Sequence, residues 1–369
     1  PTLDNWLNGN RESRLANASL TWEKAKKTNF GIDITMLNQR LSFTFDYFVE
    51  NRYNILTNLN TNAGDDIQRI NYPGIVGKSA PYINSSKVRN HGFDMEISWR
   101  DHIGKNFRYY IKPNFSFARN KIVFTNEIDW ETNTWRKATG KSMYTNFCYV
   151  FDHFVVDQAE ADALNKSGIQ SAAGKLIPGD AVYKDMNGDN VIDDKDRAAT
   201  GYPRSPEIMF GIPVGISYKG IDFSMLLQGA AHTSIQLMGA AIYDFPNFDQ
   251  DKMGKVKSIH LQRWTPETAG IAKYPALHLG THLNNKNNHS SLFLYDGQYV
   301  RLKNIEIGYS LPHNLIKIAN LQQVRFYVQG QNLITWDKLD DADVDPETSS
   351  DGSWYPIQKT INFGVNITF

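Results

Sequence analysis

The sequence predicts an all-β protein: a transmembrane antiparallel up-and-down β-barrel, to which this chain contributes about nine strands and long loops. Two observations lead to this prediction. Short segments in which apolar and polar residues alternate recur along the chain, and the connections between them are alternately short and long. No apolar run approaches the ~18 to 20 residues of a membrane helix, so a crossing of the bilayer has to be made by strands.

The alternation is cleanest at the carboxyl end of the chain. One face of this last segment carries Ile361, Phe363, Val365, Ile367 and Phe369, and the other carries threonine, asparagine and Gly364. A strand between lipid and a polar lumen has this pattern, and so does an edge strand of a soluble β-sandwich. The rest of the chain has to separate the two interpretations.

Eight further segments alternate in the same way. In chain order they are 30–36, 41–47, 93–99, 107–117, 212–218, 221–227, 300–311 and 324–328. The apolar phase slips between Leu302 and Ile305, which predicts a β-bulge near Lys303–Asn304.

The connections between these segments differ greatly in length. Short polar turns are expected at 37–40, 101–106 and 219–220, and about one helical turn within 312–322. Long loops are expected at 51–87, 120–205, 231–298 and 337–358. Soluble sandwiches keep most connections short, whereas outer-membrane barrels alternate short periplasmic turns with long extracellular loops. The rhythm therefore favours the barrel, and it places the carboxyl terminus on the periplasmic side.

Composition excludes several classes of function. Basic and acidic residues balance at 39 each, so there is no positive field for nucleic acid. The single cysteine, Cys148, excludes an internal disulfide and a cysteine-based zinc site. No nucleophile elbow, phosphate loop or dinucleotide fingerprint occurs, so we expect no enzyme. The amino end begins Pro1-Thr2-Leu3 without methionine or a signal sequence, which we interpret as the start of a fragment of a larger protein.

One loop has the spacing of a calcium site. Oxygen-bearing side chains stand at positions 1, 3, 5, 9 and 12 of a twelve-residue stretch, and a backbone carbonyl is available at position 7. The predicted ligands are Asp185, Asn187, Asp189, the Val191 carbonyl, Asp193 and Asp196. Asn190 replaces the usual glycine, Asp196 replaces a bidentate glutamate, and no helix pair flanks the loop. The alternative is an ordinary solvated acidic turn.

Other loop residues allow two interpretations each. Exposed loop aromatics suit stacking on sugar rings, but girdle or loop-core positions account for them at least as well. They are Trp130, Trp135, Tyr243, Phe245, Phe248, Trp336 and Trp354. The carboxylates of 340–345 resemble a glycosidase pair only superficially, and a solvated acidic loop is the simpler interpretation.

Several stretches together resemble one known family. They are 295–312 (YDGQYVRLKNIEIGYSLP), 20–24 (LTWEK), 88–93 (VRNHGF), 178–180 with 183–185 (PGD, YKD), 263–267 (RWTPE) and 328–333 (VQGQNL). In this order they resemble the carboxy-terminal half of the SusC-like (SusC/RagA) TonB-dependent transporters of Bacteroidetes, from about residue 20 to the end.

The resemblance implies a plugged barrel of roughly 22 strands. It places all of 1–369 in the barrel, with the plug and the TonB-contacting segment absent from this chain. It further implies import of oligosaccharides across the outer membrane, or of oligopeptides by the same mechanism. The implied partners are a SusD-like surface lipoprotein that closes over the barrel, TonB acting through the missing part, and outer-membrane lipid. A secreted glycan-binding β-protein is the competing class, and a membrane barrel would differ from it in needing detergent.

Overall fold

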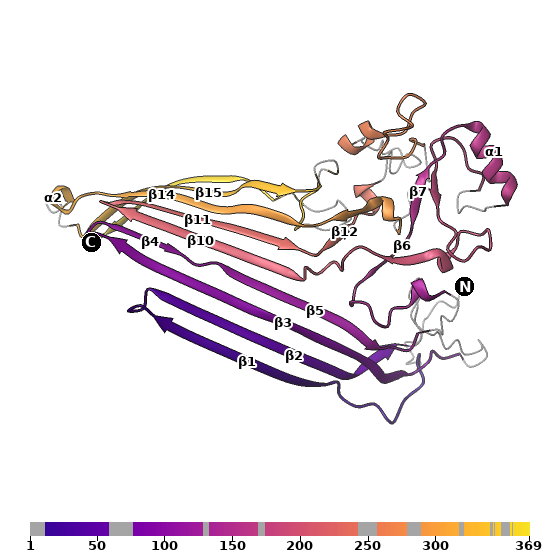
Figure 1. Cartoon of the computed structure of the whole chain (residues 1–369), viewed down its shortest axis with the longest axis horizontal. Helices are drawn as coiled ribbons and strands as arrows, with labels where there is room; N and C mark the ends of the chain where they lie inside the picture. Colours follow the sequence, from indigo (N-terminus) through magenta and orange to yellow (C-terminus); the bar gives the residue numbers. More distant parts are fainter. Residues whose placement is uncertain are drawn as a thin grey trace, which may run out of the picture.

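The computed structural model describes residues 12–58, 77–127, 133–168, 174–242, 257–278, 289–316, 321–339, 342, 344–347, 355 and 357–369. The main element of this part of the chain is one large antiparallel sheet (Figure 1). Its strands are β1 (Lys24–Met36), β2 (Leu41–Asn58), β3 (Tyr82–Ile103), β4 (Phe107–Ile111), β5 (Asn114–Phe124), β10 (Ile208–Tyr218), β11 (Ile221–Ala231), β14 (Tyr299–Ser310), β15 (Gln323–Asp337) and β16 (Thr360–Thr368).

The sheet has nine strand positions, although it is built from ten strands. Its order is β1-β2-β3-β4-β10-β11-β14-β15-β16, and β5 also pairs with both β3 and β10. β4 and β5 therefore occupy one position, interrupted at Lys112–Pro113 because proline has no N–H for the ladder. The Lys112 amide still bonds to the Pro213 carbonyl at 2.9 Å. All nine predicted segments are confirmed as strands of this sheet, which we call the wall.

Short and long connections lie at opposite ends of the sheet (Figure 1). We call them the turn end and the loop end. Lys219 and Gly220 link β10 to β11 with φ of 47° and 88°, as a two-residue hairpin turn requires. The short helix α2 (His313–Ile316) lies at the turn end, as predicted for 312–322, and so does the carboxyl terminus.

The strand register separates an apolar face from a polar one. Phe45, Phe93 and Phe115 stand side by side on β2, β3 and β5, and neighbouring ring centroids are 5.7 Å apart. On the opposite face Asp46 pairs with Asp94, whose carboxylate accepts a hydrogen bond from Ser116. The predicted alternation thus becomes two continuous faces, of which the apolar one suits lipid.

The structure confirms one predicted irregularity of the strands and corrects the length of one predicted loop. The bulge expected near Lys303–Asn304 is confirmed, because the β14–β15 register skips between Leu302 and Asn304. The loop expected at 51–87 is too long: β2 continues to Asn58 and β3 already begins at Tyr82. These strand ends are rich in asparagine and serine, and the polar composition hid them.

Several glycines on the polar face lie directly opposite aromatic residues of the neighbouring strand. Gly215 is the register partner of Tyr110, and Gly364 is that of Tyr327. A Cβ atom at either glycine would collide with the ring that lies over it. Each ring therefore covers a point of the neighbouring strand that has no side chain.

The clusters of buried apolar residues in the described part of the chain lie among the loops. Small elements form this region at the loop end: η2 (Thr134–Arg136), β6 (Asn146–Tyr149), β7 (Phe151–Phe154), α1 (Gln158–Ser167), β8 (Ala181–Tyr183), η3 (Asp194–Asp196), β9 (Arg197–Thr200), β12 (Ser234–Gln236), η4 (Gly239–Ala241), η6 (Ser258–Gln262), η7 (Ser291–Phe293) and β13 (Leu294–Asp296). The largest apolar cluster contains Leu237, Ile242, Ile259, Tyr274, Phe293 and Leu339. We call this packed group of loops the loop module.

None of the helices in the described part of the chain is long and apolar enough to span a membrane.

Candidate functional site

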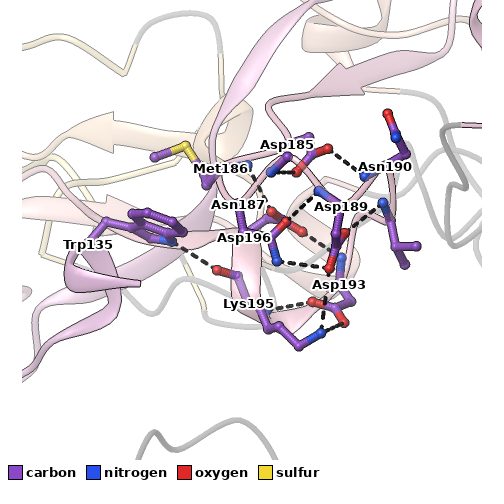
Figure 2. A network of polar contacts seen from close by, with 11 residues as sticks. Trp135, Asp185, Met186, Asn187, Asp189, Asn190, Asp193, Lys195 and Asp196 are labelled. Carbon is purple, nitrogen blue, oxygen red and sulfur yellow. Dashed lines mark hydrogen bonds and ion pairs between the residues drawn. The ribbon is translucent and has the colours of Figure 1, made fainter. Parts of the chain in front are cut away.

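The predicted calcium loop lies within the loop module, between β8 and β9 (Figure 2). β8 pairs with β7, and β9 pairs with β6, so both ends of the loop are held by short antiparallel ladders. Ile192 packs against the apolar cluster around Phe154 and Trp264, which anchors the middle of the loop to the loop module.

The first half of the loop folds around Asp185. Its carboxylate accepts hydrogen bonds from the amides of Gly188 at 2.6 Å and Asn190 at 2.7 Å. Asn190 has a φ of 60°, the left-handed conformation expected where calcium loops usually carry glycine.

Asn187 and Asp189 support the same turn. The Asn187 amide group donates to Asp189 at 2.9 Å, and the Val191 amide also donates to Asp189 at 2.9 Å. The hydrogen bond from Val191, together with that from Asn187 and the nearby Lys195, lowers the pKa of Asp189. Asp189 is therefore ionised at neutral pH.

The second half of the loop closes on Asp196. This fully buried carboxylate accepts hydrogen bonds from the amides of Met186 and Asp193, each at 2.8 Å. Burial raises its pKa above the ordinary value, although both amides act in the other direction. Asp193 in turn caps η3 by accepting from the Lys195 amide at 2.8 Å.

A cation of the chain itself lies among these carboxylates. The Lys195 ammonium is 3.4 Å from Asp193 and 3.6 Å from Asp189. The carboxylates mostly face backbone amides, and among the described residues no three His, Cys, Asp or Glu side chains converge as a metal site. Five oxygen-bearing side chains nevertheless share one turn, and oxygen atoms are the ligands that a hard cation such as calcium prefers. Calcium binding therefore stays a prediction, with Lys195 as a built-in competitor.

The loop aromatics have separate positions. Trp135 donates its indole N–H to the Lys195 carbonyl at 2.9 Å, so it holds the acidic loop to η2 (Figure 2). Trp336 lies in β15 and is 54% exposed. Trp130, Tyr243, Phe245, Phe248 and Trp354 lie outside the described residues.

A buried arginine also holds part of the loop that precedes β16. Arg301 of β14 is fully buried and donates to Thr335 at 2.9 Å and to Asp345 at 2.6 Å. It also pairs with Glu347. Asp345 is therefore a partner of this arginine, and the expectation of a simply solvated acidic loop is wrong at this residue. No sequence spacing indicates the contact, because it joins residues 44 apart.

These observations together describe a β-wall with one apolar and one polar face, short turns at one end and a packed loop module at the other. The sequence profile of TonB dependent receptor-like β-barrels matches residues 1–333. The chain belongs to this family. Barrels of TonB-dependent receptors lie in the outer membrane, and the family is one of receptors and transporters.

Curated relatives of this receptor chain agree with the assignment. TonB-dependent receptor P3 of Formosa agariphila is 25% identical over 400 residues, which cover 99% of this chain and 36% of the relative. TonB-dependent receptor SusC of Bacteroides thetaiotaomicron is 23% identical over 356 residues, covering 96% of this chain and 32% of SusC. The chain thus spans about a third of the length of these relatives.

Among solved structures, the RagAB peptide transporter has a similar fold. The TM-score is 0.67 at 20% identity, with 97% of this chain and 36% of that chain covered. The likeness supports the barrel fold of the receptor family, with this chain forming part of the barrel wall.

Proposed function

We propose that this chain forms part of the wall of an outer-membrane importer that takes up oligosaccharides. It would act with a SusD-like surface lipoprotein as a lid, and with TonB through other parts of the transporter. The observation that carries the proposal is the split between the two sheet faces, with one packed loop module at a single end. Lipid covers the apolar face, substrate passes along the polar face, and the loop module contacts the lid. In this orientation the turn end and the carboxyl terminus are periplasmic.

The experiment is uptake by cells that carry the full-length transporter. Labelled oligosaccharides should accumulate in wild-type cells, and accumulation should stop on deletion of the transporter, deletion of TonB or collapse of the proton-motive force. A deletion strain that still accumulates every oligosaccharide at the wild-type rate would contradict the proposal.

Oligopeptides are the second candidate class of substrate. The similar fold of the RagAB peptide transporter favours including them, because that protein is a transporter of peptides. The same cells are therefore given labelled oligopeptides of matched size. Uptake of peptides alone would replace oligosaccharides with peptides and leave TonB-dependent import in place.

We also propose that the acidic loop binds one structural calcium ion. Asp185, Asn187, Asp189, Asp193 and Asp196 would supply side-chain oxygens, and Val191 its carbonyl. Bound calcium would neutralise the carboxylates, displace the Lys195 ammonium and fix the loop against the lid. The calcium ion would have a structural role only.

Calorimetric titration of the full-length transporter with calcium tests this proposal. Extracellular modules bind calcium with a dissociation constant of ~10⁻⁴ to 10⁻³ M. Asp185→Asn with Asp189→Asn should abolish binding, whereas Lys195→Gln should tighten it by removing the competing ammonium. Binding that is unchanged in the double variant would show that the ion, if any, lies elsewhere.

A further inference from the structure

A cavity of about 470 Å³ lies at the loop end, beside the junction of β5, β6 and β9. Ile122 of β5 lines it and follows Ser116 at even spacing, so the cavity is on the polar face of the sheet. Its volume is within the ~300 to 1,000 Å³ typical of small-ligand sites. The cavity is thus placed along the path that we propose for substrate.

Most polar groups around the cavity are bonded to the protein itself. Gln236 accepts from the Cys148 thiol at 3.2 Å and donates to the Ser290 carbonyl at 3.1 Å. Asn146 donates to the Tyr202 carbonyl at 2.9 Å, and Ser142 to that of Asn120 at 2.9 Å. These groups shape the cavity and leave recognition to other side chains.

Arg197 is the cationic group that lines the cavity. Its side chain is 8% exposed, and its Nε donates to the Phe147 carbonyl at 3.0 Å. Its nearest carboxylate in the described part of the chain is Asp194, which is 66% exposed and lies 3.6 Å from Nη1. A pair this exposed is worth little, so it offsets only part of the cost of burying the guanidinium.

A second buried arginine strengthens the positive field. Arg136 is 4% exposed and belongs to η2, which contacts β9. Burial lowers its pKa, and the charge of Arg197 lowers it further, while Asp194 and Asp193 act in the other direction.

Tyr144 supplies an aromatic surface at the same cavity. It lines the cavity, it is 72% exposed, and its φ is 60°. A bulky residue in the left-handed region is a genuine outlier, and such strain concentrates at ligand sites. The exposed ring suits stacking against the C–H face of a sugar.

We propose that this cavity binds a uronic acid unit of the imported oligosaccharide. Arg197 pairs with the carboxylate of the sugar, and Tyr144 stacks on its ring. The inference rests on the proposed oligosaccharide import and narrows the substrate class to acidic glycans. Arginine suits the role because its planar fork matches a carboxylate with two parallel hydrogen bonds.

The test is calorimetry on the full-length transporter with its lid lipoprotein. The probes are trigalacturonate, triglucuronate and the same trisaccharides with their carboxyl groups reduced to alcohols. We expect one uronate to bind at least about ten-fold more tightly than its reduced form, as a charge-assisted pair provides. Equal affinity of acidic and reduced forms, or no uronate binding at all, would overturn the proposal.

Three variants link the preference to this cavity. Arg197→Met should abolish it, Asp194→Asn should increase it by removing the competing carboxylate, and Arg204→Met removes an exposed cation outside the cavity and should leave it unchanged. If Arg197→Met fails to fold, crystals of the wild-type complex soaked in D-glucuronate give the second measurement. A carboxylate ~2.7 to 2.9 Å from the Arg197 nitrogens supports the site, and an empty cavity overturns it.

Other outcomes separate this site from import itself. Uptake of neutral oligosaccharides or peptides without any uronate preference overturns the cavity proposal and leaves import standing. If uronates bind through Arg197 but cells show no TonB-dependent uptake, the cavity proposal stands and the import proposal fails. Binding of a triglutamate peptide through Arg197 in place of the uronates also overturns it.

Discussion

Individual side chains of β3 report which face of the wall meets lipid. Ile97 lies on the apolar face, between Met95 and Trp99, and it pairs with Phe43 of β2. Ile97→Arg would place a charge in the hydrocarbon region, with an expected cost of ~2 to 4 kcal/mol near the bilayer midplane. The measurement is the free energy of unfolding of the full-length barrel in lipid vesicles.

The matched control lies one residue away on the polar face. Ser98 lies on the polar face, but it is only 5% exposed, so an arginine there would be crowded. Glu96 is exposed on the same face, and Glu96→Arg should change stability far less than Ile97→Arg. Equal losses at the two positions would exclude the assigned register.

Arg301 is the residue for which loss of a partner should matter most. Its charge is fully buried, so removing both carboxylates with Asp345→Asn and Glu347→Gln would leave it uncompensated, at a cost of about 3 to 5 kcal/mol. We expect faster proteolysis of the loop before β16 in that double variant. Adding Arg301→Met should restore much of the resistance, and a triple variant no better than the double would contradict the assigned role.

At the level of single elements, α1 is clamped to β7 by one histidine. His153 lies 2.8 Å from Asp152 and 2.9 Å from Glu160, and the Glu160 amide bonds to the N-cap residue Asp157 at 2.9 Å. Burial acts to lower the pKa of His153, but hydrogen bonds to Asp152 and Glu160 outweigh it, so the pKa is raised above its ordinary value.

This clamp predicts a pH dependence of α1. A raised folded-state pKa gives stabilisation that is complete below the ordinary pKa of ~6.5 and is lost as pH rises through the folded-state value. Amide hydrogen exchange in α1, corrected for its intrinsic rate, should therefore be slower at pH 6 than at pH 8. His153→Gln should remove the difference, and a wild-type profile that is flat or reversed would show that His153 does not clamp the helix.

The elements also show how far sequence reasoning reaches. Alternation located all nine wall positions, and the phase slip at Leu302 located the bulge, because period and register follow from local residues. The loop module was not predicted, since Phe293, Tyr274 and Leu237 meet across long separations without a period. The same holds for the candidate site. The acidic spacing marked Asp185 to Asp196, whereas nothing local predicted that Arg197 would line a cavity.

At the scale of the whole molecule, we expect closure of the wall to depend on β16, the strand at one edge of the described sheet. β16 pairs with β15 along nine residues, from Thr360–Gln331 to Thr368–Gln323. Deleting Ile361 to Phe369 from the full-length transporter would leave β15 as an unpaired edge within hydrocarbon, which membranes do not tolerate. We expect loss of the folded, heat-modifiable band from the outer membrane.

Replacing only polar-face residues of β16 provides the control. Asn362→Ser and Asn366→Ser keep the apolar stripe and the backbone ladder, so the folded band should persist. Normal surface levels of the truncated protein would show that closure does not depend on this strand.

The glycines opposite Tyr110 and Tyr327 have a consequence for assembly. Alternation alone resists a one-residue slip between strands, but a two-residue slip restores every side chain to its correct face. Such a slip would move each tyrosine off its glycine and onto a residue whose Cβ occupies the place that the ring now fills. The glycine–tyrosine pairs thus disfavour two-residue register slips, which the alternation of apolar and polar residues does not prevent by itself.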